Sequence, residues 1–187
     1  MRDIAGFVLA GGNSTRMGSD KALLPLAGGT LLEQTCRKVE AAAGCAVIIG
    51  PPERYSHLGW EVCPDRQSGL GPLAGIVAAL SLDRAEWNLI VACDMPALET
   101  PFLRLILSLA AQSGAACLLP AGPDGRAQPL CAVYHAASRQ PLADALSRGV
   151  RKVRQALESV PVKIWQVDDK QAFLNLNTPA DWASLKT

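Results

Sequence analysis

Short apolar runs alternate with helical patterns along most of the chain, and this alternation limits the possible folds more than any other feature of the sequence. Each run is brief and flanked by glycine, proline or polar residues, which is typical of a buried strand. The expected strands are Ile4–Leu9, Ala46–Ile49, Leu89–Cys93, Ala116–Leu119, Leu130–Tyr134 and Val162–Val167. Residues at helical spacing predict helices at Leu31–Ala43, Leu73–Leu82, Thr100–Gln112, Leu142–Arg148 and Val153–Ser159.

Strands that alternate with helices are joined by right-handed crossovers. The pattern therefore predicts an α/β fold with a doubly wound, mainly parallel sheet and helices on both faces. One segment departs from this rule, because the turn residues Pro123–Arg126 could join Leu118–Leu119 to Leu130–Cys131 as an antiparallel excursion. Thr100-Pro101 and Thr178-Pro179 predict helix starts, with threonine as the N-cap and proline in the first turn.

Length and composition favour a single domain. The 187 residues are 49% hydrophobic and 19% charged, as in an ordinary globular protein. No linker, repeat or low-complexity tract divides them, so we expect one domain over residues 1–187. The 18 basic and 17 acidic side chains leave a formal charge of +1, which implies no broad attraction to nucleic acid or to an anionic membrane.

The apolar segments and the cysteines favour a cytoplasmic protein. The longest apolar candidate, Leu103–Pro120, is interrupted by Arg104, Gln112 and Gly114, so no segment is expected to cross a bilayer. The opening residues faintly resemble a signal peptide, but they run straight into two glycines and fit a first strand better. The six cysteines form no C-x-x-C pair, so neither a zinc site nor a disulfide framework is expected.

The loop after the first expected strand, Leu9–Lys21, combines glycines with cations. Glycines at Gly11 and Gly12 would let backbone N–H groups approach a triphosphate closely, and Arg16 and Lys21 would balance its charge. The spacing fits neither a P-loop nor a dinucleotide-binding Rossmann motif. The alternative is a glycine-rich turn whose cations face the solvent.

Asp94 follows another buried strand, where the carboxyl edge of an open parallel sheet binds its ligand. A single carboxylate is enough to anchor Mg²⁺, which completes its shell with phosphate oxygens and water. The ion would bridge nucleotide and acceptor phosphates and neutralise charge during transfer. The alternative for an isolated aspartate at a strand end is a helix cap or a turn residue.

Several of these segments together resemble a known family. The first loop, L-A-G-G-x-S-x-R-M-G-x-D-K, resembles the signature loop of nucleotidyltransferases that activate sugars and cofactors. Its double glycine is most similar to that of the molybdenum cofactor guanylyltransferases. The C-D-x-P segment at Asp94, G-P-L-A-G at Gly71–Gly75 and F-x-N-x-N-T-P at Phe173–Pro179 extend the resemblance over essentially the whole chain. It implies a Rossmann-like nucleotidyltransferase fold.

The resemblance also implies roles for particular residues. Arg16, Lys21 and Asp94 would be catalytic, with Asp94 holding Mg²⁺. The residues expected to bind the nucleotide or the second substrate are Leu9, Ala10, Gly11, Gly12, Lys21, Asp65, Gly71, Gly75, Asp94, Asn175 and Asn177.

Simpler structural roles remain open for some of these residues. Asp65 could instead form a surface ion pair with Arg66, the glycines of G-P-L-A-G could serve helix packing, and Asn177 could belong to a turn.

The implied reaction transfers GMP from GTP to the terminal phosphate of molybdenum-molybdopterin, with proteins that donate the pterin and receive the product as partners. The cations of Arg148–Arg154 would hold the acceptor phosphate, or they could be a solvated helix start. Gly50-Pro51-Pro52 stands where these enzymes often carry an asparagine, which leaves guanine recognition to other groups. The alternatives are a transferase that uses CTP on the same pterin, a sugar-phosphate nucleotidyltransferase, or a non-catalytic carrier.

Overall fold

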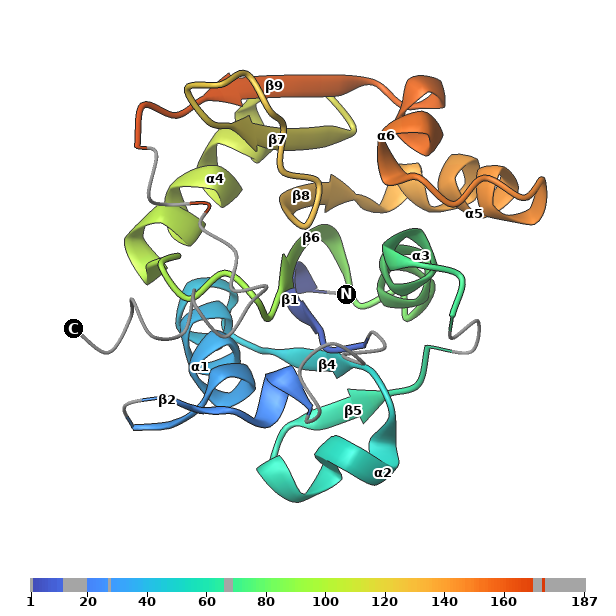
Figure 1. Cartoon of the computed structure of the whole chain (residues 1–187). Helices are drawn as coiled ribbons and strands as arrows, with labels where there is room; N and C mark the ends of the chain where they lie inside the picture. Colours follow the sequence, from blue (N-terminus) through green and yellow to red (C-terminus); the bar gives the residue numbers. More distant parts are fainter. Residues whose placement is uncertain (1, 12–19, 27, 66–68, 170–172, 174–187) are drawn as a thin grey trace.

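The computed structural model describes residues 2–11, 20–26, 28–65, 69–169 and 173. Its main feature is a seven-stranded sheet with the strand order β5-β4-β1-β6-β8-β7-β9 (Figure 1). The strands of this sheet are β1 (Arg2–Leu9), β4 (Val47–Ile49), β5 (Glu61–Cys63), β6 (Ala85–Ala92), β7 (Cys117–Ala121), β8 (Cys131–His135) and β9 (Val162–Gln166). Two short strands, β2 (Pro25–Leu26) and β3 (Gly29–Thr30), pair separately in an antiparallel hairpin.

The sheet is parallel except for one strand. β5, β4, β1 and β6 pair in parallel, as do β7 and β9. β8 runs antiparallel to both of its neighbours, with Val133 opposite Leu89 of β6 and Leu118 of β7. The predicted antiparallel excursion is therefore present. The connection between the paired residues is longer than the turn signal alone suggested, because β7 and β8 pair at Cys117 with Tyr134 and at Leu118 with Val133.

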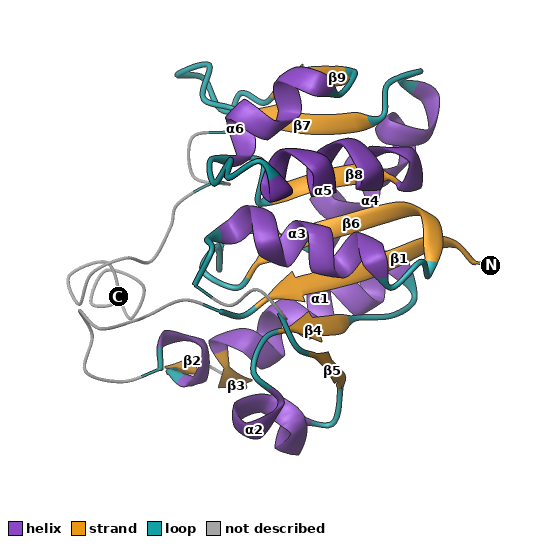
Figure 2. Ribbon diagram, turned by 90° about the vertical axis from the view of Figure 1, so that its right-hand side faces the viewer, coloured by secondary structure: helices purple, strands orange, loops and turns teal. Residues whose placement is uncertain are grey.

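Helices cover both faces of the sheet, as the predicted fold requires. One face carries α1 (Leu31–Ala43) and α4 (Thr100–Gln112), and the other carries α3 (Pro72–Ser81), α5 (Arg139–Ser147) and α6 (Val153–Ala156) (Figures 1 and 2). Successive side chains of a strand point to opposite faces. Accordingly, Phe7 packs with the α3 side and Val8 with the α1 side. The predicted α/β class with a doubly wound, mainly parallel sheet is confirmed.

Element boundaries differ from the predictions where a polar residue breaks an apolar pattern. β6 begins at Ala85, four residues earlier than expected, because the buried amide of Asn88 donates to the carbonyls of Ala85 and Tyr134. Thr100 is the first residue of α4, and Glu99 is its N-cap, so the prediction of Thr100 as the N-cap is wrong by one residue. Thr178-Pro179 lies outside the described residues.

Some short elements were not predicted. These are β5, the hairpin of β2 and β3, the four-residue helix α2 (Pro52–Tyr55), and the 3-10 helices η1 (Lys21–Leu23), η2 (Ser56–Leu58) and η3 (Ala136–Ser138). A further 3-10 helix is η4 (Leu157–Ser159). The expected helix over Val153–Ser159 is split between α6 and η4. Over the described ranges, no helix combines the length and the apolar character that a membrane span needs.

Candidate active site

The carboxyl ends of β1, β4, β5 and β6 lie at one edge of the sheet, and backbone hydrogen bonds fix the points where the loops leave it. Cys93 N donates to Leu9 O at 3.2 Å, and Ala10 N donates to Ile49 O at 2.9 Å. Gly50 N donates to Cys63 O at 3.0 Å. The loops after these four strands therefore start from a rigid platform, which is where open parallel sheets bind their ligands.

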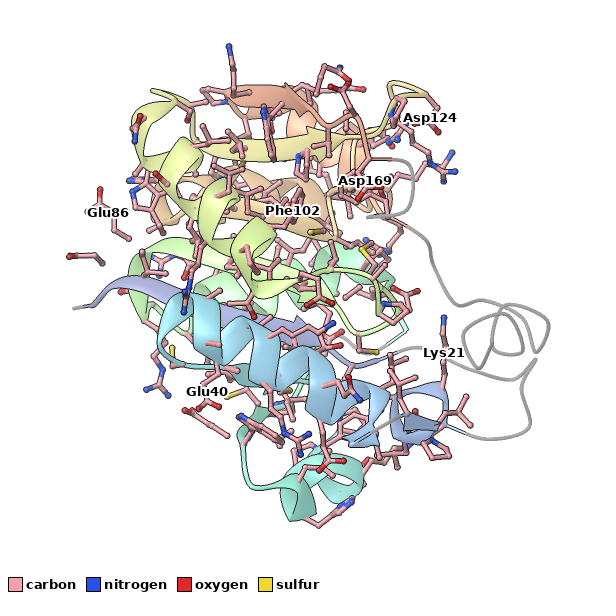
Figure 3. All side chains as sticks on the ribbon, turned by 90° about the vertical axis from the view of Figure 1, so that its left-hand side faces the viewer. Lys21, Glu40, Glu86, Phe102, Asp124 and Asp169 are labelled. Atoms are coloured by element: carbon pink, nitrogen blue, oxygen red, sulfur yellow. The ribbon has the colours of Figure 1, made fainter. Side chains whose placement is uncertain are left out.

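Lys21 and Asp94 meet at this edge, although 73 positions separate them in the sequence. Lys21 is the first residue of η1, and Asp94 lies two residues beyond the end of β6. Lys21 Nζ lies 3.4 Å from Asp94 Oδ2, and the two side chains are 13% and 29% exposed. This separation is longer than that of a tight charged hydrogen bond, so the two groups form a loose ion pair. Figure 3 shows Lys21 at this edge of the molecule.

The first loop leaves β1 through Ala10 and Gly11, the last described residues before its middle part. The side chains of Leu9 and Ala10 are buried in the cores on opposite faces of the sheet, so only their backbone groups can meet a ligand. Gly11 is exposed, and a Cβ atom added to it would meet no other atom within 4 Å. Gly12 and Arg16, two of the predicted site residues, lie outside the described residues.

The second glycine-bearing segment surrounds the start of α3. Gly71 is the N-cap of this helix and has a φ of +84°, a backbone conformation that residues with a Cβ atom rarely adopt. Gly75 is buried inside α3, where an added Cβ would lie 3.3 Å from Leu9 Cδ2. The Gly75 position therefore serves close packing of α3 on β1. Asp65 is half-buried and follows β5, at the same edge of the sheet as Asp94.

A cleft opens beside Asp94, under the connection between β7 and β8. The residues that line it are Asp94, Met95, Arg126, Ala127, Gln128, Pro129, Leu130 and Arg154. Arg154 is tied to this connection, since its Nη2 donates to Ala127 O at 3.0 Å. Tyr134 supports the base of the cleft by donating its hydroxyl to Pro129 O at 2.7 Å. Two guanidinium groups and one carboxylate thus share a single cleft.

The structure separates the four cations predicted at Arg148–Arg154. Arg154 lines the cleft, whereas the guanidinium of Arg151 donates to the carbonyl of Leu146 at the end of α5. Arg126 was not predicted as a site residue. Its signal was the turn at Pro123–Arg126, which placed it in a loop but did not say which edge of the sheet the loop occupies. In Figure 3, Asp124 of that loop lies at the same edge as Lys21.

The F-x-N-x-N-T-P segment is described only at its first residue. Phe173 packs edge-on against Phe102 of α4, with 5.8 Å between the ring centroids. It also lies close to Gly122, in the connection between β7 and β8. Asn175 and Asn177 lie outside the described residues.

The thiol next to Asp94 is not a nucleophile. Burial, and to a smaller extent the neighbouring charge of Asp94, raise the pKa of Cys93 to about 12. A thiol with such a pKa stays protonated at neutral pH and is unreactive. The site therefore favours direct transfer between two bound substrates over a covalent enzyme intermediate on this cysteine.

Comparison with known proteins agrees with this geometry. The MobA-like NTP transferase domain matches residues 6–162 of the chain. The chain belongs to this family. It is 37% identical over 184 residues to a protein of Yersinia pestis named molybdenum cofactor guanylyltransferase, and the match covers 96% of this chain and 93% of the relative. The resemblance inferred from the sequence is confirmed, and so is the expected class of enzyme, a nucleotidyltransferase.

Two further relatives extend the comparison. A protein of Deinococcus radiodurans, named probable molybdenum cofactor guanylyltransferase, is 34% identical over 185 residues, which cover 99% of this chain and 95% of the relative. The crystal structure of molybdopterin-guanine dinucleotide biosynthesis protein A from Archaeoglobus fulgidus superimposes with a TM-score of 0.82 at 27% identity, covering 96% of this chain and 95% of that one. This family shares the fold over nearly its whole length.

Proposed function

We propose that this protein transfers GMP from GTP to the terminal phosphate of molybdenum-molybdopterin, giving the guanine dinucleotide cofactor and pyrophosphate. The observation that carries the proposal is the pairing of Lys21 with Asp94 at the carboxyl edge of the sheet. A cation and a carboxylate at this place suit a magnesium-bound triphosphate. The curated relatives named above support the choice of substrates.

Asp94 is the proposed metal ligand. Its carboxylate is partly exposed and lies two residues beyond β6, and the described residues contain no cluster of three side chains that could hold a metal by themselves. A single carboxylate fits Mg²⁺, which keeps waters and phosphate oxygens in its shell, better than it fits zinc. When bound, the ion would neutralise charge on the phosphates during transfer.

Lys21 and the first loop would hold the triphosphate. Lys21, whose Nζ lies 3.4 Å from the Asp94 carboxylate, would bind the phosphate oxygens beside a metal held by Asp94. The proposal assigns the same task to Arg16 and to the backbone N–H groups of Gly11 and Gly12. The acceptor phosphate is already ionised at neutral pH, so the reaction depends on positioning and charge neutralisation rather than on a strong base.

The acceptor would bind in the cleft beside Asp94, apart from the first loop that would hold the triphosphate. Arg126 and Arg154 line this cleft and supply the positive charge that a phosphate monoester requires. Asn175 and Asn177 are proposed to contact the acceptor as well. In this arrangement the α-phosphate lies between the incoming phosphate and the leaving pyrophosphate, as an in-line displacement needs.

The first experiment measures pyrophosphate release with Mg²⁺, molybdenum-loaded molybdopterin and each of GTP, CTP, ATP and UTP. Release with GTP alone is the expected result. A preference for CTP would instead make the protein a cytidylyltransferase on the same pterin and would connect Gly50 with altered base choice. Binding of GTP without release from any of the four nucleotides would favour a carrier.

The proposed reaction belongs in the cytoplasm. All six cysteines are thiols, which is typical of a reducing compartment. The proposal also includes proteins that deliver molybdopterin and receive the dinucleotide product.

A further inference from the structure

The carboxylate of Asp20, the residue before Lys21, is held from two sides. Its Oδ1 accepts a hydrogen bond from Ala22 N at 3.1 Å, which makes Asp20 the N-cap of η1. Its Oδ2 accepts the hydroxyl of Tyr55 at 2.9 Å and lies 3.4 Å from Arg54 Nη1. Hydrogen bonds to a charged acceptor are stronger than neutral ones, so these contacts fix the orientation of the carboxylate.

Tyr55 is itself immobilised. The residue is 2% exposed and packs in the same core as Ala10 and Ala22. Its ring lies so close to Gly50 that a Cβ atom built there would be 3.0 Å from Tyr55 Cε2. Burial raises the pKa of the Tyr55 hydroxyl above its usual value, and the hydrogen bond to Asp20 raises it further. The hydroxyl therefore remains a donor at neutral and mildly alkaline pH.

These contacts act on Lys21 through the geometry of η1. Asp20 caps this three-residue turn, and Lys21 is its first residue. The backbone of Lys21 sets where its long side chain begins and the direction in which it leaves η1, so a loosened turn lets the ammonium group occupy more positions. Removing a support of Asp20 would therefore move Lys21 Nζ away from its place beside Asp94.

We propose that the Tyr55 hydroxyl and the Asp20 carboxylate form a positioning pair that holds Lys21 where it meets the nucleotide phosphates. The pair ties the lysine to α2, the segment that follows β4, over a separation of 35 positions in the sequence. Neither residue touches the substrate in this assignment. The inference rests on the proposed function of Lys21 but adds Tyr55, which lies outside the sequence motif, and gives a supporting role to Asp20, which is the aspartate of that motif.

The first test is Tyr55→Phe, which removes one oxygen and keeps the buried ring. We expect kcat/KM for GTP to fall about tenfold, because a small misplacement of a positioned group weakens transition-state stabilisation. The KM for the pterin acceptor should stay unchanged. The matched control is Ser56→Ala, since the Ser56 hydroxyl donates to Pro52 O within the same short segment and does not reach Asp20. This control should keep wild-type kinetics, and an equal loss in both variants would overturn the assignment.

The second test asks whether the hydroxyl works through Lys21. Tyr55→Phe is introduced into a Lys21→Ala background, and each enzyme is assayed well below its melting temperature. No further loss in the double variant is expected, because the group to be positioned is already gone. Independent, multiplying losses would assign Tyr55 a purely structural role and overturn the proposal. Asp20→Asn, which keeps one acceptor oxygen, should retain more activity than Asp20→Ala.

Equilibrium binding of GTP separates this inference from the proposed function. Measured without acceptor, GTP affinity should be about tenfold weaker in Tyr55→Phe than in the wild type, whichever acceptor the enzyme uses. Unchanged affinity together with unchanged turnover would reject the positioning pair alone. A wild-type protein that binds no GTP would reject the proposed function and the inference together.

Discussion

Gly50 is a position where the backbone leaves no room for a side chain. A Cβ atom there would collide with the carbonyl oxygen of Ala10 and would crowd the ring of Tyr55. Glycine at this position permits a close approach between the ends of β1 and β4, beside the loop proposed to hold the phosphates.

Replacing Gly50 by alanine should therefore destabilise the fold. We expect the free energy of unfolding to fall by about 2 kcal/mol, the usual range for overpacking against atoms that cannot easily move. Denaturant unfolding measures the change. Gly11→Ala is the matched control for stability, because its Cβ would enter open space. Equal stability of both variants would contradict the close-approach explanation.

Asp94→Ala should abolish turnover and leave the fold intact. The carboxylate is partly exposed and lies 3.4 Å from Lys21 Nζ, whose side chain is itself 13% exposed, so its removal leaves no fully buried charge behind. Loss of the metal anchor should lower kcat by at least about 100-fold, the scale of a missing electrostatic contact in the transition state. Pyrophosphate release and circular dichroism report the two effects. Turnover that survives the substitution would reject the metal role.

The sequence indicated that Lys21 and Asp94 lie at one edge of the sheet, but not which contacts support them. Lys21 and Asp94 each follow an apolar strand, and parallel strands deliver such residues to one edge. The hydrogen bond between Tyr55 and Asp20 has no comparable signal. It depends on the path of the chain after β4, which neither hydrophobic periodicity nor a motif describes.

Among the secondary-structure elements, α1 has the most complete N-terminal cap. Thr30 Oγ1 accepts from Glu33 N at 3.3 Å, and Glu33 Oε2 accepts from Thr30 N at 2.7 Å, which together form a capping box. Thr30→Ala should cost about 1 kcal/mol of unfolding free energy. Thermal or denaturant unfolding checks this, with Ser81→Ala as a control because the Ser81 hydroxyl bonds only to Val77 O within its own helix.

The same cap predicts a pH dependence. The hydrogen bonds from the Thr30 backbone and side chain lower the pKa of Glu33. A lowered pKa in the folded state stabilises the protein above the unfolded pKa of about 4.3, and this contribution is lost as the pH falls through the folded value. The wild type should have a higher free energy of unfolding than Glu33→Gln at neutral pH, and this difference should be lost only below about pH 4. A constant difference between pH 7 and pH 3 would contradict this.

Element length decided which parts of the fold were predictable. The helices α1 and α4 have 13 residues each, enough to show a helical period, and their bounds match the prediction. β5 has 3 residues and α2 has 4, which is too short for any period to appear. β4 is equally short, but its apolar run was enough to predict it. In the fold, β5 pairs with β4, and α2 buries the ring of Tyr55.

For the whole molecule, ligand binding at the carboxyl edge should appear as global stabilisation. With magnesium, GTP at about 100 times its Kd should add about 2.7 kcal/mol to the free energy of unfolding. For a chain of this length the melting temperature should then rise by roughly 5 to 10 °C. Differential scanning fluorimetry measures the shift, and Asp94→Ala should reduce it. A full shift without magnesium would argue against a metal-bridged triphosphate.

The reversed direction of β8 separates the loop proposed to bind the acceptor from the loops proposed to bind the nucleotide. Because β8 is antiparallel to both β6 and β7, the connection from β7 to β8 lies at the same edge of the sheet as Asp94. This connection contains no crossover helix. Residues 122–130 can therefore change in length or composition while the crossovers that carry the nucleotide loops stay the same. A lineage of such enzymes can diversify in what it modifies while conserving how it activates the nucleotide.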